Sequence, residues 1–111
     1  MLKLEQQGAV AVFRTDEPLV GDAVPQAAAV MQQSTNIGQR MAVLDLQSVP
    51  LIDSAGLELL LDQQEAFEHN GGSLKLAGAN ALCHDILRCA GIAKRFQTFP
   101  DVKSAVGSFV R

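Results

Sequence analysis

Aromatic residues are scarce in this sequence, which contains neither tryptophan nor tyrosine. We therefore expect a core built mainly from Leu, Val, Ile and Ala, with five phenylalanines as its largest pieces: Phe13, Phe67, Phe96, Phe99 and Phe109. A chain of 111 residues can bury one such core without disulfide or metal staples. This length predicts a single domain over residues 1–111.

Basic residues are also in short supply. Nine Lys and Arg residues are outnumbered by twelve Asp and Glu residues, which gives a formal net charge of −3 at pH 7. The nearest approach to a basic cluster is Arg88, Lys94 and Arg95. Because proteins that bind nucleic acid neutralise its phosphates with a basic patch or stripe, this composition disfavours nucleic-acid binding.

The sequence lacks long apolar runs and a charged-then-apolar pattern at its start. A membrane-spanning helix needs about 20 predominantly apolar residues in a row, and a secretory signal needs a basic start followed by an apolar stretch. We therefore expect a cytoplasmic protein with no membrane insertion.

Cysteine occurs only twice, as Cys83 and Cys89, six residues apart in a predicted helix. This spacing places the two thiols about 120° apart around the helix axis, so they are badly placed to bridge each other. Together with His84 they match no zinc-binding spacing. We expect two small buried thiols, which suits a reducing compartment.

Strand-like and helix-like stretches alternate along most of the chain. Strands are predicted at 2–6, 9–13, 41–46, Ser73–Ala77 and 96–99. Helices are predicted to begin at Asp22, at Asp53-Ser54, at Asn80 and at Pro100-Asp101. The nearly continuous apolar run at 41–46 is typical of a central strand covered on both faces. The order ββαβαβαβα predicts an α/β fold with a small mixed sheet, mostly parallel, flanked by about four helices.

Helical periodicity also predicts which side chains face the core. In the helix beginning at Asp53-Ser54, the inward face comprises Leu57, Leu60, Leu61, Gln64 and Phe67. Leu59 falls on the opposite side, where it either packs on a neighbouring helix or belongs to a partner surface. In the helix capped by Asn80, the residues expected to face inward are Leu82, Ile86 and Cys89.

The turn at Asp53 and Ser54 follows the strand at 41–46. Loops after strand ends are where alternating α/β folds carry their functional groups. Either side chain could cap the first N–H groups of the helix. The Ser54 hydroxyl also lies at the positive end of the helix, where negative charge is stabilised. Ser54 is therefore either a plain helix cap or a reactive or modifiable oxygen.

Catalysis by Ser54 is not predicted. A nucleophile elbow has glycine two residues before the serine, and Ile52 occupies that position here. His69 lies about 22 Å along the same helix, too far to act as a base, and His84 belongs to another helix. The sequence has neither a Walker nor a Gly-x-Gly-x-x-Gly phosphate-binding pattern. We expect no enzyme, no metal site and no cofactor.

Two sets of residues resemble those of a known family. The first is Val43-Leu44-Asp45-Leu46, Val49 and Ile52-Asp53-Ser54-Ala55-Gly56-Leu57; the second is Gly72-Ser73-Leu74-Lys75-Leu76, Ala90-Gly91-Ile92 and Phe96. Together they are similar to the signature of STAS domains, in particular the bacterial anti-sigma factor antagonists. The resemblance covers nearly the whole chain. The fold that it implies, a small mixed sheet flanked by four or five helices, agrees with the ββαβαβαβα order.

The resemblance implies a switched binding module rather than a catalyst. In such proteins an anti-sigma factor that is itself a serine kinase phosphorylates the serine of the Asp-Ser motif, and a serine phosphatase resets it. The unphosphorylated form binds the kinase and frees a sigma factor. By motif position Ser54 is the phosphorylation site, with Asp53 as its acidic neighbour. The predicted partner surface comprises Asp22, Asp53, Ser54, Ala55, Gly56, Glu58 and Leu59.

The alternative hypothesis is a constitutive scaffold subunit of a stress-signalling or lipid-transport complex. In that case Ser54 is only a helix cap, and binding runs through Leu59 and its neighbours. A phosphate on Ser54 supports the switch, whereas its persistent absence in the presence of the kinase and ATP supports the scaffold.

Overall fold

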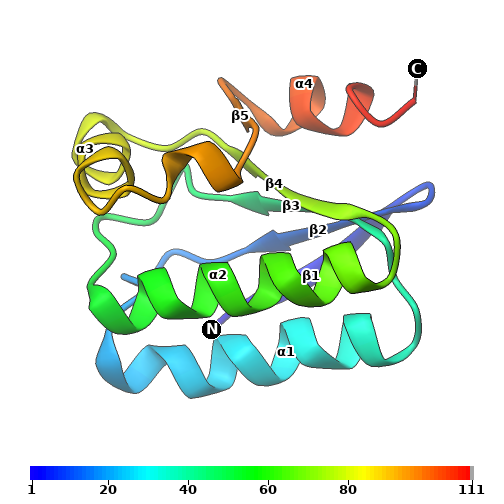
Figure 1. The fold of residues 1–111 in the computed structure, drawn as a ribbon, viewed down its shortest axis with the longest axis horizontal. Helices are drawn as coiled ribbons and strands as arrows, with labels where there is room; N and C mark the ends of the chain where they lie inside the picture. Colours follow the sequence, from blue (N-terminus) through cyan, green and yellow to red (C-terminus); the bar gives the residue numbers. More distant parts are fainter. Residues whose placement is uncertain (111) are drawn as a thin grey trace.

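Five strands form one sheet in the computed structural model, which describes residues 1–110 (Figure 1). The strands are β1 (Lys3–Gln7), β2 (Val10–Arg14), β3 (Met41–Asp45), β4 (Ser73–Ala77) and β5 (Thr98–Phe99). The helices are α1 (Val24–Asn36), α2 (Ser54–His69), α3 (Ala81–Cys89) and α4 (Val102–Gly107), with short 3-10 turns η1 (Gly21–Ala23) and η2 (Ala93–Arg95). None of the helices in residues 1–110 is long and apolar enough to cross a membrane. The order of elements confirms the predicted α/β fold.

The sheet is mixed, as predicted. Its strands lie in the order β1-β2-β3-β4-β5; β1 is antiparallel to β2, and the other neighbours are parallel. β3 is therefore central and covered on both faces, which explains its apolar sequence. The carboxyl ends of β2, β3 and β4 meet at one edge, where the chain enters the loops that lead to α1, α2 and α3. Functional groups in alternating folds gather at this edge.

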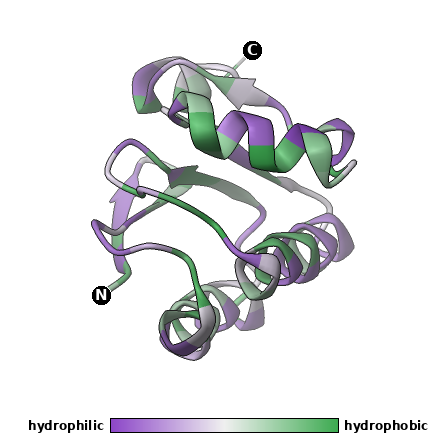
Figure 2. Cartoon of the chain, turned by 90° about the vertical axis from the view of Figure 1, so that its left-hand side faces the viewer, coloured by the Kyte–Doolittle hydropathy of each residue, from purple (hydrophilic) through white to green (hydrophobic). Residues whose placement is uncertain are grey.

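Two hydrophobic clusters lie on opposite faces of the sheet. The larger cluster includes Phe13, Leu44 and Phe67 and is covered by α1 and α2, which lie side by side (Figure 1). The smaller cluster includes Val43 and Ala105 and is covered by α4. Neighbours such as Val43 and Leu44 belong to different clusters because side chains alternate along a strand. Figure 2 shows both hydrophobic and hydrophilic stretches on the helices, as expected where one side of each faces a core.

The start of α1 differs from the prediction. The sequence predicts Asp22 as the N-cap, but Asp22 lies inside η1, and the N-cap is Ala23, which makes no side-chain cap hydrogen bond. The N–H of Gly21 donates to Asp53 Oδ2 at 3.0 Å, and this contact holds the chain in η1 one turn before α1 begins. Pro25 lies in the first turn of α1, where its missing N–H costs little.

The buried face of α3 also differs from the prediction. Cys83 and Leu87 are buried, whereas Leu82 and Cys89 are exposed, and only Ile86 among the predicted inward residues packs partly against the core. The side of this nine-residue helix that packs on the core runs through Cys83, Ile86 and Leu87. It is therefore rotated around the helix axis from the predicted side. The prediction of two buried thiols therefore holds for Cys83 and is wrong for Cys89.

Both ends of α3 are closed by hydrogen bonds, and the start is capped by Asn80 as predicted. The side chain of Asn80 accepts a hydrogen bond from the N–H of Cys83 at 2.7 Å. At the other end Gly91 has a φ of 76°, and the N–H of Ile92 donates to the carbonyl of Leu87 at 3.2 Å. This is the backbone geometry of a helix that ends in a left-handed glycine.

Candidate functional site

Asp53 caps α2 and at the same time holds the loop that precedes α1. Its Oδ1 accepts a hydrogen bond from the N–H of Gly56 at 3.0 Å, and its Oδ2 accepts one from the N–H of Gly21 at 3.0 Å. Both bonds favour the ionised carboxylate and so lower the pKa of Asp53 below its ordinary value of 3.8. The bond from Gly56 has the larger effect, and the bond from Gly21 the next largest. Of the two predicted caps, Asp53 therefore fills the role.

Ser54 is the first residue of α2, and its side chain is exposed. Within residues 1–110 its hydroxyl oxygen makes no hydrogen bond, because Asp53 already binds the N–H group that a capping serine would take. The hydroxyl is thus accessible, uncommitted and located at the positive end of a 16-residue helix. This arrangement suits an oxygen that receives a negatively charged group.

A tight backbone contact fixes the first turn of α2 against the loop containing Leu19. Leu19 and Ile52 form an isolated parallel bridge, with hydrogen bonds from the N–H of Leu19 to the carbonyl of Leu51 at 3.0 Å and from the N–H of Asp53 to the carbonyl of Leu19 at 3.2 Å. A Cβ placed on Gly56 would lie 2.2 Å from the Leu19 carbonyl oxygen. Only glycine allows this approach, and Ser54 is therefore held on a rigid frame.

The residues of the predicted partner surface do not all reach the surface. Ser54, Glu58 and Asp22 are exposed, and Asp53 and Ala55 are half-buried. Two residues are buried instead, namely Gly56 and Leu59. Gly56 packs on the Leu19 backbone, and Leu59, 4% exposed, belongs to the core cluster beneath α1 and α2, so both residues make their contacts within this chain. Of the two alternatives for Leu59, internal packing is correct.

The exposed side of α2 carries a row of acidic residues that begins beside Ser54. Glu58 and Asp62 follow Ser54 at intervals of four residues, and Glu65 continues the row; all are exposed. Residues three or four apart lie on the same side of a helix. Asp62, Glu65 and His69 also line a groove of about 460 Å³ between the C-terminal halves of α1 and α2. Sequence reasoning missed this row, although its spacing is readable in the sequence.

Within residues 1–110 no catalytic pair forms around Ser54. Ser54 begins α2 and His69 ends it, so the helix itself separates them, and His84 belongs to α3. Among the described residues, no histidine is hydrogen-bonded to Ser54. Nor does any group of three His, Cys, Asp or Glu side chains within residues 1–110 have the geometry to hold a metal ion.

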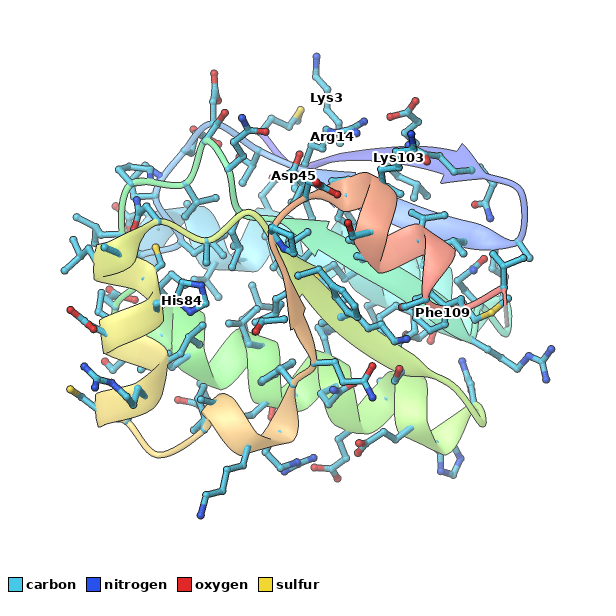
Figure 3. The ribbon with its side chains drawn as sticks, turned by 90° about the horizontal axis from the view of Figure 1, so that it is seen from above. Lys3, Arg14, Asp45, His84, Lys103 and Phe109 are labelled. Atoms are coloured by element: carbon cyan, nitrogen blue, oxygen red, sulfur yellow. The ribbon has the colours of Figure 1, made fainter. Side chains whose placement is uncertain are left out.

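A second set of charged residues lies at the same edge of the sheet. The Nε of Arg14 donates to Asp45 Oδ2 at 3.1 Å, and the Nη1 of Arg14 contacts Glu5. Asp45 Oδ1 also accepts from the N–H of Gln47 at 3.0 Å, which fixes the turn after β3. Figure 3 shows Arg14 and Asp45 pointing toward each other near Lys3. Asp45 therefore stabilises the strand ends through Arg14 and the backbone.

Comparison with known proteins gives one family match. A model of the STAS domain family matches residues 1–105. A proposed anti-sigma factor antagonist from Thermotoga maritima is 17% identical, with a TM-score of 0.93 over 99% of this chain and 95% of that one. The anti-sigma factor antagonist SpoIIAA in its unphosphorylated form is 18% identical, with a TM-score of 0.86 over 99% of this chain and 96% of that one.

The same fold also occurs in a different class of protein. A sulfate transporter family protein from Wolinella succinogenes is 19% identical, with a TM-score of 0.76 over 92% of this chain and 85% of that one. Among curated protein sequences, none matches significantly. At 17–19% identity the three structural likenesses establish the fold. Because the family model covers all but the last few residues, the chain belongs to the STAS domain family.

Proposed function

We propose that this chain is an anti-sigma factor antagonist whose binding to an anti-sigma factor with serine kinase activity is switched off by phosphorylation of Ser54. The observation that carries the proposal is the exposed, uncommitted Ser54 hydroxyl on a helix that Asp53 already caps. The likeness to SpoIIAA, an anti-sigma factor antagonist with an unphosphorylated form, supports the same assignment. A serine phosphatase that removes the phosphate completes the cycle.

The chemical step is a phosphoryl transfer carried out by the partner. The Ser54 oxygen attacks the γ-phosphorus of ATP, the bond from that phosphorus to the bridging oxygen breaks, and ADP leaves while the hydroxyl proton passes to a base of the kinase. This chain contributes only the acceptor oxygen, held in place by the Asp53 cap and the Gly56–Leu19 contact. The phosphatase reverses the modification by hydrolysis and releases inorganic phosphate.

The phosphate acts on the partner and leaves the fold of this chain unchanged. It adds a charge of about −1.5 to −2 at neutral pH. At the start of α2 this charge is compatible with the helix dipole, so the helix keeps its structure. The contact surface, however, already carries Asp22 and Glu58. The phosphate therefore adds bulk and like charge to an acidic surface, which disfavours a partner that fits the unmodified serine.

Binding measurements on two Ser54 variants test the proposal. We expect Ser54→Ala to bind the kinase as tightly as the unmodified chain, and Ser54→Asp to bind at least about tenfold more weakly. The same Asp substitution should leave the fold intact and change the free energy of unfolding by no more than about 1 kcal/mol, in the stabilising direction.

Ser104→Asp is the matched control. Ser104 is an exposed serine in the first turn of α4, a helix also capped by an aspartate, on the opposite side of the sheet. This variant should bind the kinase as the wild type does. Equal binding by wild type and Ser54→Asp, or an equal loss in Ser104→Asp, contradicts the proposal.

Two observations weaken the constitutive scaffold hypothesis. That hypothesis makes Ser54 a helix cap, a role that Asp53 fills, and it directs binding through Leu59, which is buried. A scaffold would also keep Ser54 unmodified when the kinase and ATP are present, which mass spectrometry of the Ser54 peptide measures.

A further inference from the structure

The outer edge of β1 is an open sheet edge. β1 pairs with β2 on one side only, and no other strand within residues 1–110 lies on its outer side. Four of its five residues are exposed. Open edges offer unpaired N–H and C=O groups to a second strand, and proteins usually block them with charged side chains or bulges. The pattern of side chains on this edge determines whether it repels or accepts another strand.

The direction of the backbone groups along β1 follows from its hairpin. β1 and β2 are joined by a two-residue turn at Gly8, which has a φ of 60°, and Gln7 pairs with Val10 next to the turn. In such hairpins the closing pair is hydrogen-bonded, and bonded pairs alternate along the strands. The backbone groups of Leu4 and Gln6 therefore point outward. The N–H of Leu2 does so as well, since it donates to the side chain of Gln26.

The side chains of β1 divide into an apolar side and a charged side. Leu4 is 46% exposed and borders a groove of about 540 Å³ that is also lined by Val30 of α1 and by the 84% exposed Ile37, the residue that follows α1. On the other face of the strand, Lys3 and Glu5 flank Leu4. Figure 3 shows the Lys3 side chain extending away from the body of the molecule.

We infer that a second copy of this chain docks on this edge, with the two β1 strands antiparallel and Leu4 opposite Leu4 on a two-fold axis. In this register the outward backbone groups of the two Leu4 residues form a hydrogen-bonded pair. The Leu4 side chains meet between the two grooves. Lys3 of each copy lies opposite Glu5 of the other, so both charge pairs are attractive.

The register is selected by charge. A shift of the two-fold axis to Glu5 keeps each side chain on its own face of the sheet, but it places two glutamates directly opposite each other and leaves Leu4 opposite Gln6. Only the register centred on Leu4 combines an apolar self-contact with two opposite-charge pairs. Isologous contacts of this kind close into a dimer and do not propagate.

The experiment uses two charge reversals that complement each other. Sedimentation or light scattering over a dilution series should give the wild type a mass that rises toward twice the 11.8 kDa of one chain. Lys3→Glu alone and Glu5→Lys alone each place like charges across the axis and should remain monomeric. An equimolar mixture of the two variants should dimerise, because each glutamate of one chain then meets a lysine of the other.

Further variants separate this interface from other modes of association. Leu4→Lys should abolish the dimer, whereas Leu82→Lys, the same change at an exposed leucine on α3, should not. Circular dichroism confirms that each variant is folded. A monomeric wild type at all concentrations, a dimer that survives Leu4→Lys, or single variants that fail to dimerise when mixed overturns the inference. A foreign strand captured by a monomeric wild type overturns it as well.

Discussion

Asp53 joins two segments that lie far apart in the sequence. One carboxylate oxygen binds the first turn of α2 through Gly56, and the other binds Gly21 in the loop before α1. The neighbouring Ser54 makes no such contact within the described part of the chain, so the structural role and the proposed functional role fall on separate residues. A substitution of Ser54 should therefore leave the Asp53 cap in place, and a substitution of Asp53 should leave the Ser54 hydroxyl present.

The lowered pKa of Asp53 predicts an acid dependence of stability. Because the pKa is lower in the folded state, the carboxylate stabilises the fold above its ordinary pKa of 3.8, and this stabilisation is lost as the pH falls through the folded value. Asp53→Asn should therefore be less stable than the wild type at pH 7. The difference should shrink below about pH 4.

Urea unfolding at a series of pH values measures this difference. Asp101 also has a lowered pKa, from its hydrogen bonds with Ser104, but that carboxylate is present in both proteins and cancels from the comparison. A stability difference that does not change between neutral and acidic pH contradicts the role assigned to the Asp53 charge.

Replacing Gly56 with alanine should destabilise the fold, because even a methyl group does not fit there. In Gly56→Ala the new Cβ would lie 2.2 Å from the Leu19 carbonyl oxygen and 2.7 Å from Ile52 Cγ2. Since the backbone must shift, we expect a loss of about 1–3 kcal/mol in the free energy of unfolding. Gly107→Ala in α4 is the control, because its Cβ would meet no atom of another described residue (1–110) within 4 Å, its chain neighbours and its own helix turn aside. Equal effects of the two substitutions in denaturant unfolding would refute this account.

Some of these residue roles can be predicted from the sequence, and others cannot. Asp53 and Ser54 are readable as a helix start after a buried strand, because capping is a local property. The role of Gly56 and the burial of Leu59 are not readable, since both depend on segments brought in from elsewhere, the Leu19 loop and α1. Asp22 is misread for the same reason, because Gly21 is held by Asp53 from 32 positions away.

At the scale of elements, a glutamine side chain replaces part of a strand. β5 has only two residues and pairs with Leu76 and Ala77 of β4, so it does not reach Leu74. Gln64 of α2 fills that place. Its Oε1 accepts from the N–H of Leu74 at 2.7 Å, and its Nε2 donates to the carbonyls of Leu74 at 3.0 Å and Arg95 at 2.7 Å.

Two adjacent buried glutamines in α2 should respond oppositely to the same substitution. Gln64→Leu removes the partner of both Leu74 backbone groups, and each unsatisfied group costs about 1–3 kcal/mol, so a clear loss of stability is expected. Gln63 is also buried, but its Oε1 has no hydrogen-bond partner among residues 1–110. Gln63→Leu should therefore be neutral or stabilising.

Thermal and denaturant unfolding of the two variants tests this contrast, because both make the same change at positions next to each other in one helix. Equal losses of stability in Gln63→Leu and Gln64→Leu would show that the Leu74 contacts contribute nothing measurable. The contrast also depends on both variants keeping the helical content of the wild type, which far-ultraviolet circular dichroism monitors.

The sequence predicts the elements better than it predicts their orientation. Alternating strand and helix signals give the correct order, and the Asn80 cap of α3 is correctly placed because capping chemistry is local. The predicted buried face of α3 is wrong, because Leu82 and Ile86 show the same four-residue spacing as Cys83 and Leu87, and only packing in the fold distinguishes the two pairs. In the sequence, Gln64 can be recognised only as a polar residue on the core face of α2. The three backbone groups that it binds belong to Leu74 and Arg95, which lie on other elements.

At the scale of the whole molecule, one sheet separates two cores of unequal size. The larger core holds α2 firmly against the sheet, so Ser54 at its start is fixed by packing as well as by the Asp53 cap. The open β1 edge belongs to a different part of the surface, formed by β1 and α1. The proposed dimerisation there and the proposed kinase binding at Ser54 therefore use separate surfaces, and variants of one site should leave the other intact.

The most direct measurement is the affinity of the kinase for this chain with and without a phosphate on Ser54. The phosphorylated chain is prepared with the kinase and ATP, its modified residue is identified by mass spectrometry, and both forms are titrated against the kinase by calorimetry. We predict a single phosphate on Ser54, a melting temperature within a few degrees of the unmodified chain, and an affinity at least about tenfold lower. Phosphate at another residue, or equal affinity of the two forms, contradicts the account.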